Sequence, residues 1–176
     1  MAVYSVFEST NMASTHYAER IFDCVCVEDV ENGMFGHMED VKTEGGVVYN
    51  FVKGLKEGCP VLVVDQPAWT EDTSRMTNQR KDKFYVPAGT VFRARVVKVN
   101  DEFALSPEGF VGEPAIDKYV SVDTNGKLAV ADAPVEDAVM VGKIMRKRKV
   151  GSTLVTGVRT YGYARVMHTV KVESLA

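Results

Sequence analysis

The sequence predicts an all-β protein, a compact β-sandwich or small β-barrel, and three observations support that prediction. About one residue in six is valine, which favours strands over helices. Apolar and polar residues alternate with period two in several segments that are bounded by turn residues. Helical periodicity is scarce, because the best candidate, residues 68–84, has no apolar stripe at helical spacing.

The alternation places the strands in order along the chain. We expect them at residues 21–27, 47–52, 61–64, 90–99, 118–130 (a hairpin), 138–145 and 161–172. In the hairpin, Asn125 and Gly126 suit the two left-handed positions of a type I′ turn. In the last segment His168 alternates with small and apolar residues, which predicts a core or interface histidine. With 176 residues in all, residues 20–176 are expected to form a single β domain.

Two further segments do not fit a core strand. Residues 1–19 scatter apolar groups among Ser, Thr and Asn, which predicts an extended N-terminal arm that orders against a neighbour, with Tyr4 and Phe7 as partner-binding residues. Residues 68–84 form a long polar loop excursion, and loops of that length are usually functional or disordered. Its Trp69 is either a loop anchor packed on its own domain or an interface hot spot.

Residues that could carry catalysis or bind a metal are sparse. His37 lies in the sequence GHMED, beside two carboxylates but without a second imidazole, so we expect a solvated loop rather than a metal site. Cys24, Cys26 and Cys59 lack metal-site spacing and are expected to be free thiols. The sequence has neither a GxSxG elbow nor a phosphate-binding glycine loop. We therefore expect no enzyme activity, no metal and no cofactor.

The charge of the chain limits the classes of partner that it is expected to bind. The net charge is −3 and the isoelectric point about 5.7, which argues against a global attraction to nucleic acid or to anionic membranes. No stretch approaches the ~20 apolar residues of a membrane span, and no secretory signal is visible, so we expect synthesis in the cytoplasm. The exception is the dense basic run Arg146, Lys147, Arg148 and Lys149. It is either a solvated hairpin tip or a contact for an acidic protein or phosphate surface.

The order of the segments resembles that of the head decoration, or cement, proteins of tailed bacteriophages. The similarity spans roughly residues 20–173. It consists of the order of the segments and of short matching stretches of sequence, and it includes no catalytic motif. The matching phrases are the turn Val30-Glu31-Asn32-Gly33, the strand Val61–Val64, the polar excursion, VPAGTVFRARVVKVNDEFALSPEGF, the hairpin KYVSVDTNGKLAVAD, and a final pair near VGKIM and RVMHTVKVE. The N-terminal arm and the basic run are not part of the pattern.

The resemblance implies a virion protein on the capsid surface. Its partners would be the major capsid protein and copies of itself, often as a homotrimer, and it would need no cofactor. Two alternatives stay open: another virion subunit, of the tail tube or of head completion, and a nucleic-acid-binding β-barrel that uses Arg93, Arg95 and the basic run.

Overall fold

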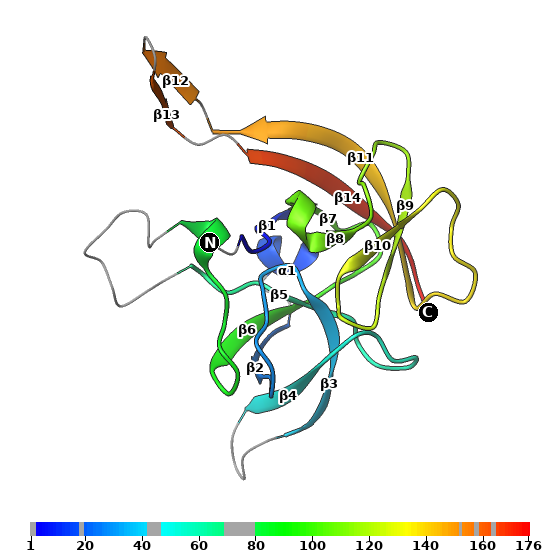
Figure 1. Cartoon of the computed structure of the whole chain (residues 1–176). Coiled ribbons are helices and arrows are strands. Elements are labelled where there is room, and N and C mark those ends of the chain that lie inside the picture. Colours follow the sequence, from blue (N-terminus) through cyan, green and yellow to red (C-terminus); the bar gives the residue numbers. More distant parts are fainter. Residues whose placement is uncertain are drawn as a thin grey trace.

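Two β layers make up the chain in a computed structural model, a closed five-stranded barrel and a seven-stranded sheet (Figure 1). The structure describes residues 3–17, 20–41, 47–68, 80–151, 153–156, 159–162 and 165–176. Within these ranges the only α-helix is the single turn α1 (Ala13–His16), and two short 3₁₀ turns, η2 (Lys81–Lys83) and η3 (Pro107–Gly109), join strands. The prediction of an all-β fold is confirmed. No helix in these ranges is long and apolar enough to span a membrane.

Going round the barrel, the strands are β2 (Ile21–Val25), β4 (Val48–Lys53), β3 (Phe35–Val41), β5 (Leu62–Val64) and β6 (Val91–Val96). The barrel closes because β6 pairs with both β5 and β2, which completes the ring of strands. Only β2 and β4 are parallel. Cys24, Phe51, Leu62 and Phe92 belong to the apolar cluster that the barrel strands bury. The predicted strands at 21–27, 47–52, 61–64 and 90–99 are confirmed here.

The sheet is built around one long ribbon. Its strands, in spatial order, are β1 (Phe7–Asn11), β7 (Glu102–Leu105), β14 (Arg165–Leu175), β11 (Met140–Val150), β9 (Tyr119–Val122), β10 (Leu128–Ala131) and β8 (Phe110–Val111). The longest pair, β11 and β14, is antiparallel with 11 residues in each strand. The chain continues from β11 through a two-stranded tip, β12 (Thr153–Thr156) and β13 (Arg159–Gly162), and returns as β14.

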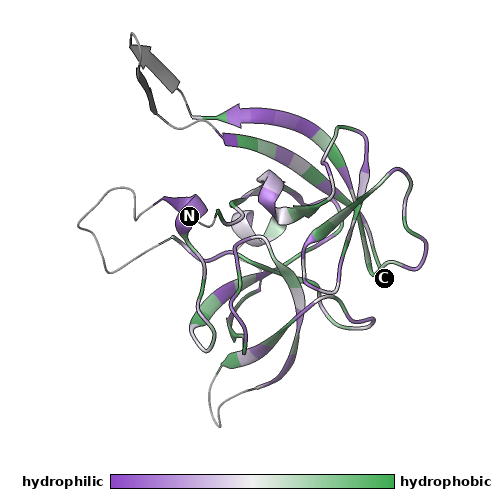
Figure 2. Ribbon diagram, viewed as in Figure 1, coloured by the Kyte–Doolittle hydropathy of each residue, from purple (hydrophilic) through white to green (hydrophobic). Residues whose placement is uncertain are grey.

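The barrel has its own apolar cluster, and a second cluster, the shared core, joins the barrel to the sheet. On β5, Leu62 belongs to the barrel cluster, whereas the neighbouring Val63 belongs to the second cluster together with sheet residues such as Ile144 and Val170. The rings of Phe35 on β3 and Phe103 on β7 lie 5.5 Å apart across this second cluster. In Figure 2 the hydrophobic colour is concentrated where the two layers meet, and the hydrophilic colour covers the outer half of β11. Burial between the layers therefore holds the two together.

The N-terminal residues differ from the extended arm that the sequence suggested. Phe7 is 5% exposed and Met12 is fully buried, and both belong to the shared core. Strand β1 pairs with β7, and the backbone N–H of Ala13 donates to Asp101 Oδ1 at 2.8 Å. Because β1 is an edge strand with a single apolar residue facing inward, its sequence looks polar although its position is structural.

Three local predictions are corrected. The turn of the β9–β10 hairpin is not type I′, because Gly126 has φ +78° while Asn125 is not among the residues with positive φ. The side chain of Asp123 instead accepts hydrogen bonds from the N–H groups of Asn125 and Lys127, at 2.9 and 2.7 Å. The basic run lies inside β11 and not after a strand. The segment that contains His37 is not a solvated loop, because it forms strand β3 and His37 is 7% exposed. No alternation of apolar and polar residues predicts this strand.

Candidate partner-binding surface

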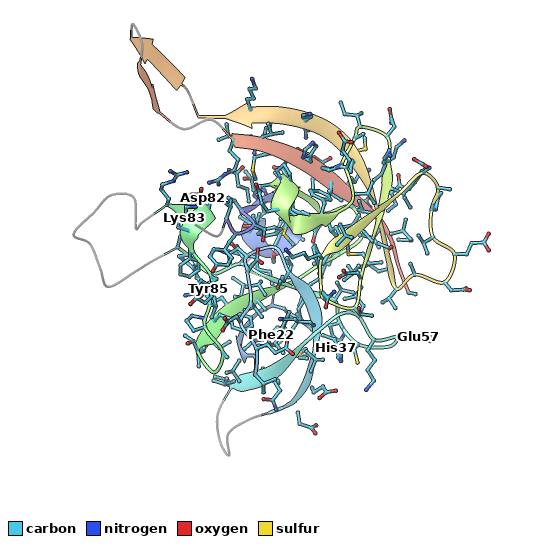
Figure 3. All side chains as sticks on the ribbon, viewed as in Figure 1. Phe22, His37, Glu57, Asp82, Lys83 and Tyr85 are labelled. Atoms are coloured by element: carbon cyan, nitrogen blue, oxygen red, sulfur yellow. The ribbon has the colours of Figure 1, made fainter. Side chains whose placement is uncertain are left out.

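Three surface segments meet at one end of the sheet: the N-terminal residues, the return of the polar excursion near residue 80, and the outer half of the β11–β14 ribbon. The backbone N–H of Tyr4 donates to the carbonyl of Asp82 at 2.9 Å. The ring of Tyr4 lies against that of Tyr85, with 4.9 Å between centroids. Figure 3 places Asp82 and Lys83 beside this end of the chain, with Tyr85 below them. The N-terminal residues are thus held along the segment that closes the excursion.

A buried carboxylate ties that segment to the ribbon. Asp82 is 3% exposed and accepts two hydrogen bonds from the guanidinium of Arg80, at 3.0 and 2.8 Å. Arg165, the first residue of β14, approaches the same carboxylate at 3.7 Å. A buried charge is tolerated only when it is paired and hydrogen-bonded, and the two arginines supply that pairing. The start of β14 and the end of the excursion are therefore fixed relative to each other.

The basic run is divided between the two faces of β11, because successive side chains of a strand point to opposite sides. Arg146 pairs with Glu102 of β7 at 2.8 Å, and Arg148 pairs with Glu8 of β1. Lys147 and Lys149 lie on the other face, are exposed, and have no charged partner among the described residues. Arg148 thus links the ribbon to the N-terminal strand and Arg146 links it to β7, and the two lysines remain available to a partner.

We call the meeting point of these segments the junction surface, defined by Tyr4, Glu8, Arg80, Asp82, Arg148 and Arg165. A hollow of about 330 Å³ opens in it, lined by Glu8, Lys81, Val150, Gly151 and the residues of the Asp82 pairing. In the segments 4–8, 80–85, 146–150 and 165, eight side chains are basic and two, Glu8 and Asp82, are acidic. The eight are Arg80, Lys81, Lys83, Arg146, Lys147, Arg148, Lys149 and Arg165. Three further carboxylates contact neighbouring residues: Glu31 accepts from the N–H of Ser5, Asp65 from the hydroxyl of Ser9, and Glu102 pairs with Arg146.

Two loops of the same sheet have the opposite charge. The exposed loops at 112–118 and 132–138 bring together five acidic residues and one lysine: Glu113, Asp117, Asp132, Glu136, Asp137 and Lys118. In Figure 1 the loop at 132–138 lies far from the outer half of β11, whereas the loop at 112–118 reaches the middle of that strand, where the N–H of Asp117 donates to Ile144 O at 2.9 Å. A chain whose net charge is −3 therefore has a strongly basic end, which a net charge alone conceals.

The predicted partner-binding residues fall into three groups. Tyr4 and the run from Arg146 to Lys149 lie at or beside the junction surface. Phe7 lies in the core, where it stabilises the fold and is closed to a partner. Trp69 lies outside the described residues. Sequence reasoning missed Arg80, Asp82 and Arg165, because Asp82 stands in a run of polar and basic residues that gives no sign of burial.

The titratable side chains of His168, Cys24 and His37 lie among residues of the folded core or its backbone, and their environments are explained by the fold. Burial, together with the charge of Lys147, lowers the pKa of His168. Its two ring nitrogens have no hydrogen-bond partner among the described residues, and its ring packs on Phe110. Burial and then the nearby Asp23 raise the pKa of the Cys24 thiol to about 12, so it is protonated at neutral pH. His37 Nδ1 lies 2.9 Å from the carbonyl oxygen of Gly54. In the described part of the chain, no three His, Cys, Asp or Glu side chains form a metal-binding group.

Comparison of the chain with protein-family models, with curated proteins and with solved structures finds no match.

Proposed function

We propose that this chain is a structural protein of a tailed-bacteriophage virion, a decoration or cement protein that binds the outer surface of the head and stabilises it. The observation that carries the proposal is the junction surface. Three segments from distant parts of the sequence meet there, and their described residues are mainly basic although the net charge of the protein is −3. The order of strand and turn phrases along the chain, which resembles that of decoration proteins, supports the same function.

The partner is a repeated acidic surface, that of the major capsid protein, and the protein acts there by burying surface without catalysis. Each exposed ion pair contributes only about 0–1 kcal/mol, so the lysines set the encounter rate and the register more than the affinity. Copies of the chain, as a homotrimer, bind the repeated lattice together, and their avidity multiplies weak single contacts. The protein is made in the host cytoplasm and functions on the virion.

Co-sedimentation with shells of the major capsid protein of the same phage tests the proposal. The informative variant is Lys147→Glu/Lys149→Glu, since both side chains are exposed and unpaired within the described structure. We expect it to weaken binding about tenfold or more, because four units of charge change in each copy. Lys56→Glu is the matched control, because Lys56 is an exposed lysine of a loop away from the junction surface.

The decoration function is contradicted if wild-type protein does not co-sediment at any salt concentration. Tight binding to random duplex DNA with a steep salt dependence, and none to the shells, would assign the basic end to nucleic acid instead.

A further inference from the structure

The outer half of β11 has an open edge. On that side β9 pairs with β11 only from Val141 to Lys143. Ile144 then donates its N–H to Lys118 O and accepts from the N–H of Asp117, both at 2.9 Å. From Met145 to Val150, no described residue pairs with this edge, although β14 pairs with the opposite edge on both sides of an irregularity at Met145. Figure 1 shows β11 on the outside of the ribbon, with β14 between it and the N-terminal strand.

The register determines which backbone groups point toward the open edge. In an antiparallel pair, successive residues direct their N–H and C=O groups alternately toward and away from the partner strand. Ile144, opposite Val170, directs its groups away from β14, toward Lys118. The register shifts between Ile144 and Arg146, so Met145 is an extra residue and the next two register pairs are Arg146 with Thr169 and Lys147 with His168. Alternation therefore directs the backbone groups of Lys147, and then of Lys149, to the open edge.

The side chains of the same two residues lie on one face of the ribbon. Lys147 and Lys149 are exposed and have no charged partner among the described residues, whereas Arg146 and Arg148, on the other face, are paired with carboxylates. A strand added at this edge would place its residues directly opposite the two lysines, with Cβ atoms about 5 Å apart. Negatively charged side chains at the two positions opposite them would pair with the lysines. These positions are two residues apart in the added strand.

A second copy of β11 does not meet that requirement. Antiparallel pairing of two identical edges would set lysines and arginines against lysines and arginines, and like charges directly opposite each other destabilise a pair of strands. Charged side chains on an edge strand are a known means of preventing such self-association. The open edge therefore rejects its own copy and favours an acidic strand.

We propose that the open edge of β11, from Met145 to Val150, binds an extended acidic segment of a partner protein as an added antiparallel strand, with carboxylates opposite Lys147 and Lys149. The inference rests on the proposed function and deepens it, since the segment would belong to the capsid subunit. Backbone hydrogen bonds supply the affinity of such strand addition, and the side-chain pairs supply its selectivity.

A short blocked peptide in which glutamate alternates with valine is the probe, and its binding to isotope-labelled full-length protein is followed by NMR. We expect the largest shifts at the amides of Lys147 and Lys149. Methylation of the glutamate backbone nitrogens, which face β11 in the added strand, should weaken binding about tenfold, because it removes the inter-strand hydrogen bonds. Methylation of the valine nitrogens, which face away, is the matched control and should leave the affinity nearly unchanged.

Variants of the protein give a second readout. Lys147→Ser/Lys149→Ser should weaken the unmodified peptide about tenfold, and Lys56→Ser should not change it. Equal binding of the two methylated peptides, or shifts confined to residues outside β11, would overturn strand addition and leave only charge attraction. If the shells bind and the peptide does not, the edge inference fails and the proposed function stands. Binding of the peptide without binding of the shells gives the reverse conclusion.

Discussion

His168 is a residue whose position in the sequence revealed its burial but not its chemistry. Alternation with apolar residues predicted a core histidine, and its exposure of 2% confirms that prediction. The sequence did not reveal that both ring nitrogens lack a hydrogen-bond partner within the described part of the chain, or that Lys147 lies directly opposite on β11. A charged imidazole there would be buried and close to a second cation, which is why its neutral form is favoured.

The unfolding free energy should consequently depend on pH through His168. Its pKa is lower in the folded protein than in the unfolded chain, where it is about 6.5. The stabilisation is thus complete above that value and is lost as pH falls through it toward the folded pKa, because the unfolded chain then binds the extra proton. Urea unfolding at a series of pH values should show this loss in the wild type and a smaller loss in His168→Leu. His16→Gln, at an exposed histidine, is the control, and equal pH dependence of wild type and His168→Leu would refute the assignment.

Among the elements, strands in which apolar and polar residues alternate regularly were predictable. Strands whose inward face lacks large apolar residues were not. Strands such as β6 and β14 carry regularly spaced apolar residues and were located from the sequence. Strand β3 was missed, because Gly36 occupies an interior position where a Cβ would lie 2.3 Å from the Val52 carbonyl oxygen. Packing requires a residue without a side chain at this position, so the pattern of large apolar residues that would predict the strand is interrupted there. The basic run was assigned to a loop because charge masked the continuation of β11.

The N-terminal strand gives a direct test at this scale. Phe7→Ala removes a buried ring that contacts Phe103, with 5.5 Å between ring centroids, and should lower the unfolding free energy by about 3–5 kcal/mol. Tyr4→Ala, whose side chain is partly exposed, is the matched control and should cost roughly 1 kcal/mol. Urea denaturation of the full-length variants measures both. A loss below about 1 kcal/mol for Phe7→Ala would mean that β1 is not part of the folded core in solution.

At the scale of the whole molecule, the fold brings together charged segments that are distant in the sequence. The all-β class followed from composition and alternation, but the junction surface did not, since it joins residues 4–8, 80–85, 146–150 and 165, which only the topology makes neighbours. A buried carboxylate such as Asp82 has no signature in a polar segment. Net charge was misleading for the same reason, because the basic groups of the junction surface are separate from the acidic groups of the loops at 112–118 and 132–138.

Hydrogen exchange of the protein bound to capsid shells, compared with the free protein, tests the central claim most directly, that the basic end of the sheet is the partner-binding surface. We predict that binding slows amide exchange at residues 145–150 of β11, where the open edge is unpaired within the described structure, and at residues 80–85 of the junction surface. Exchange in the acidic loops at 112–118 and 132–138 should stay as it is in the free protein. Protection of those loops, with unchanged exchange along the outer half of β11, would contradict the account.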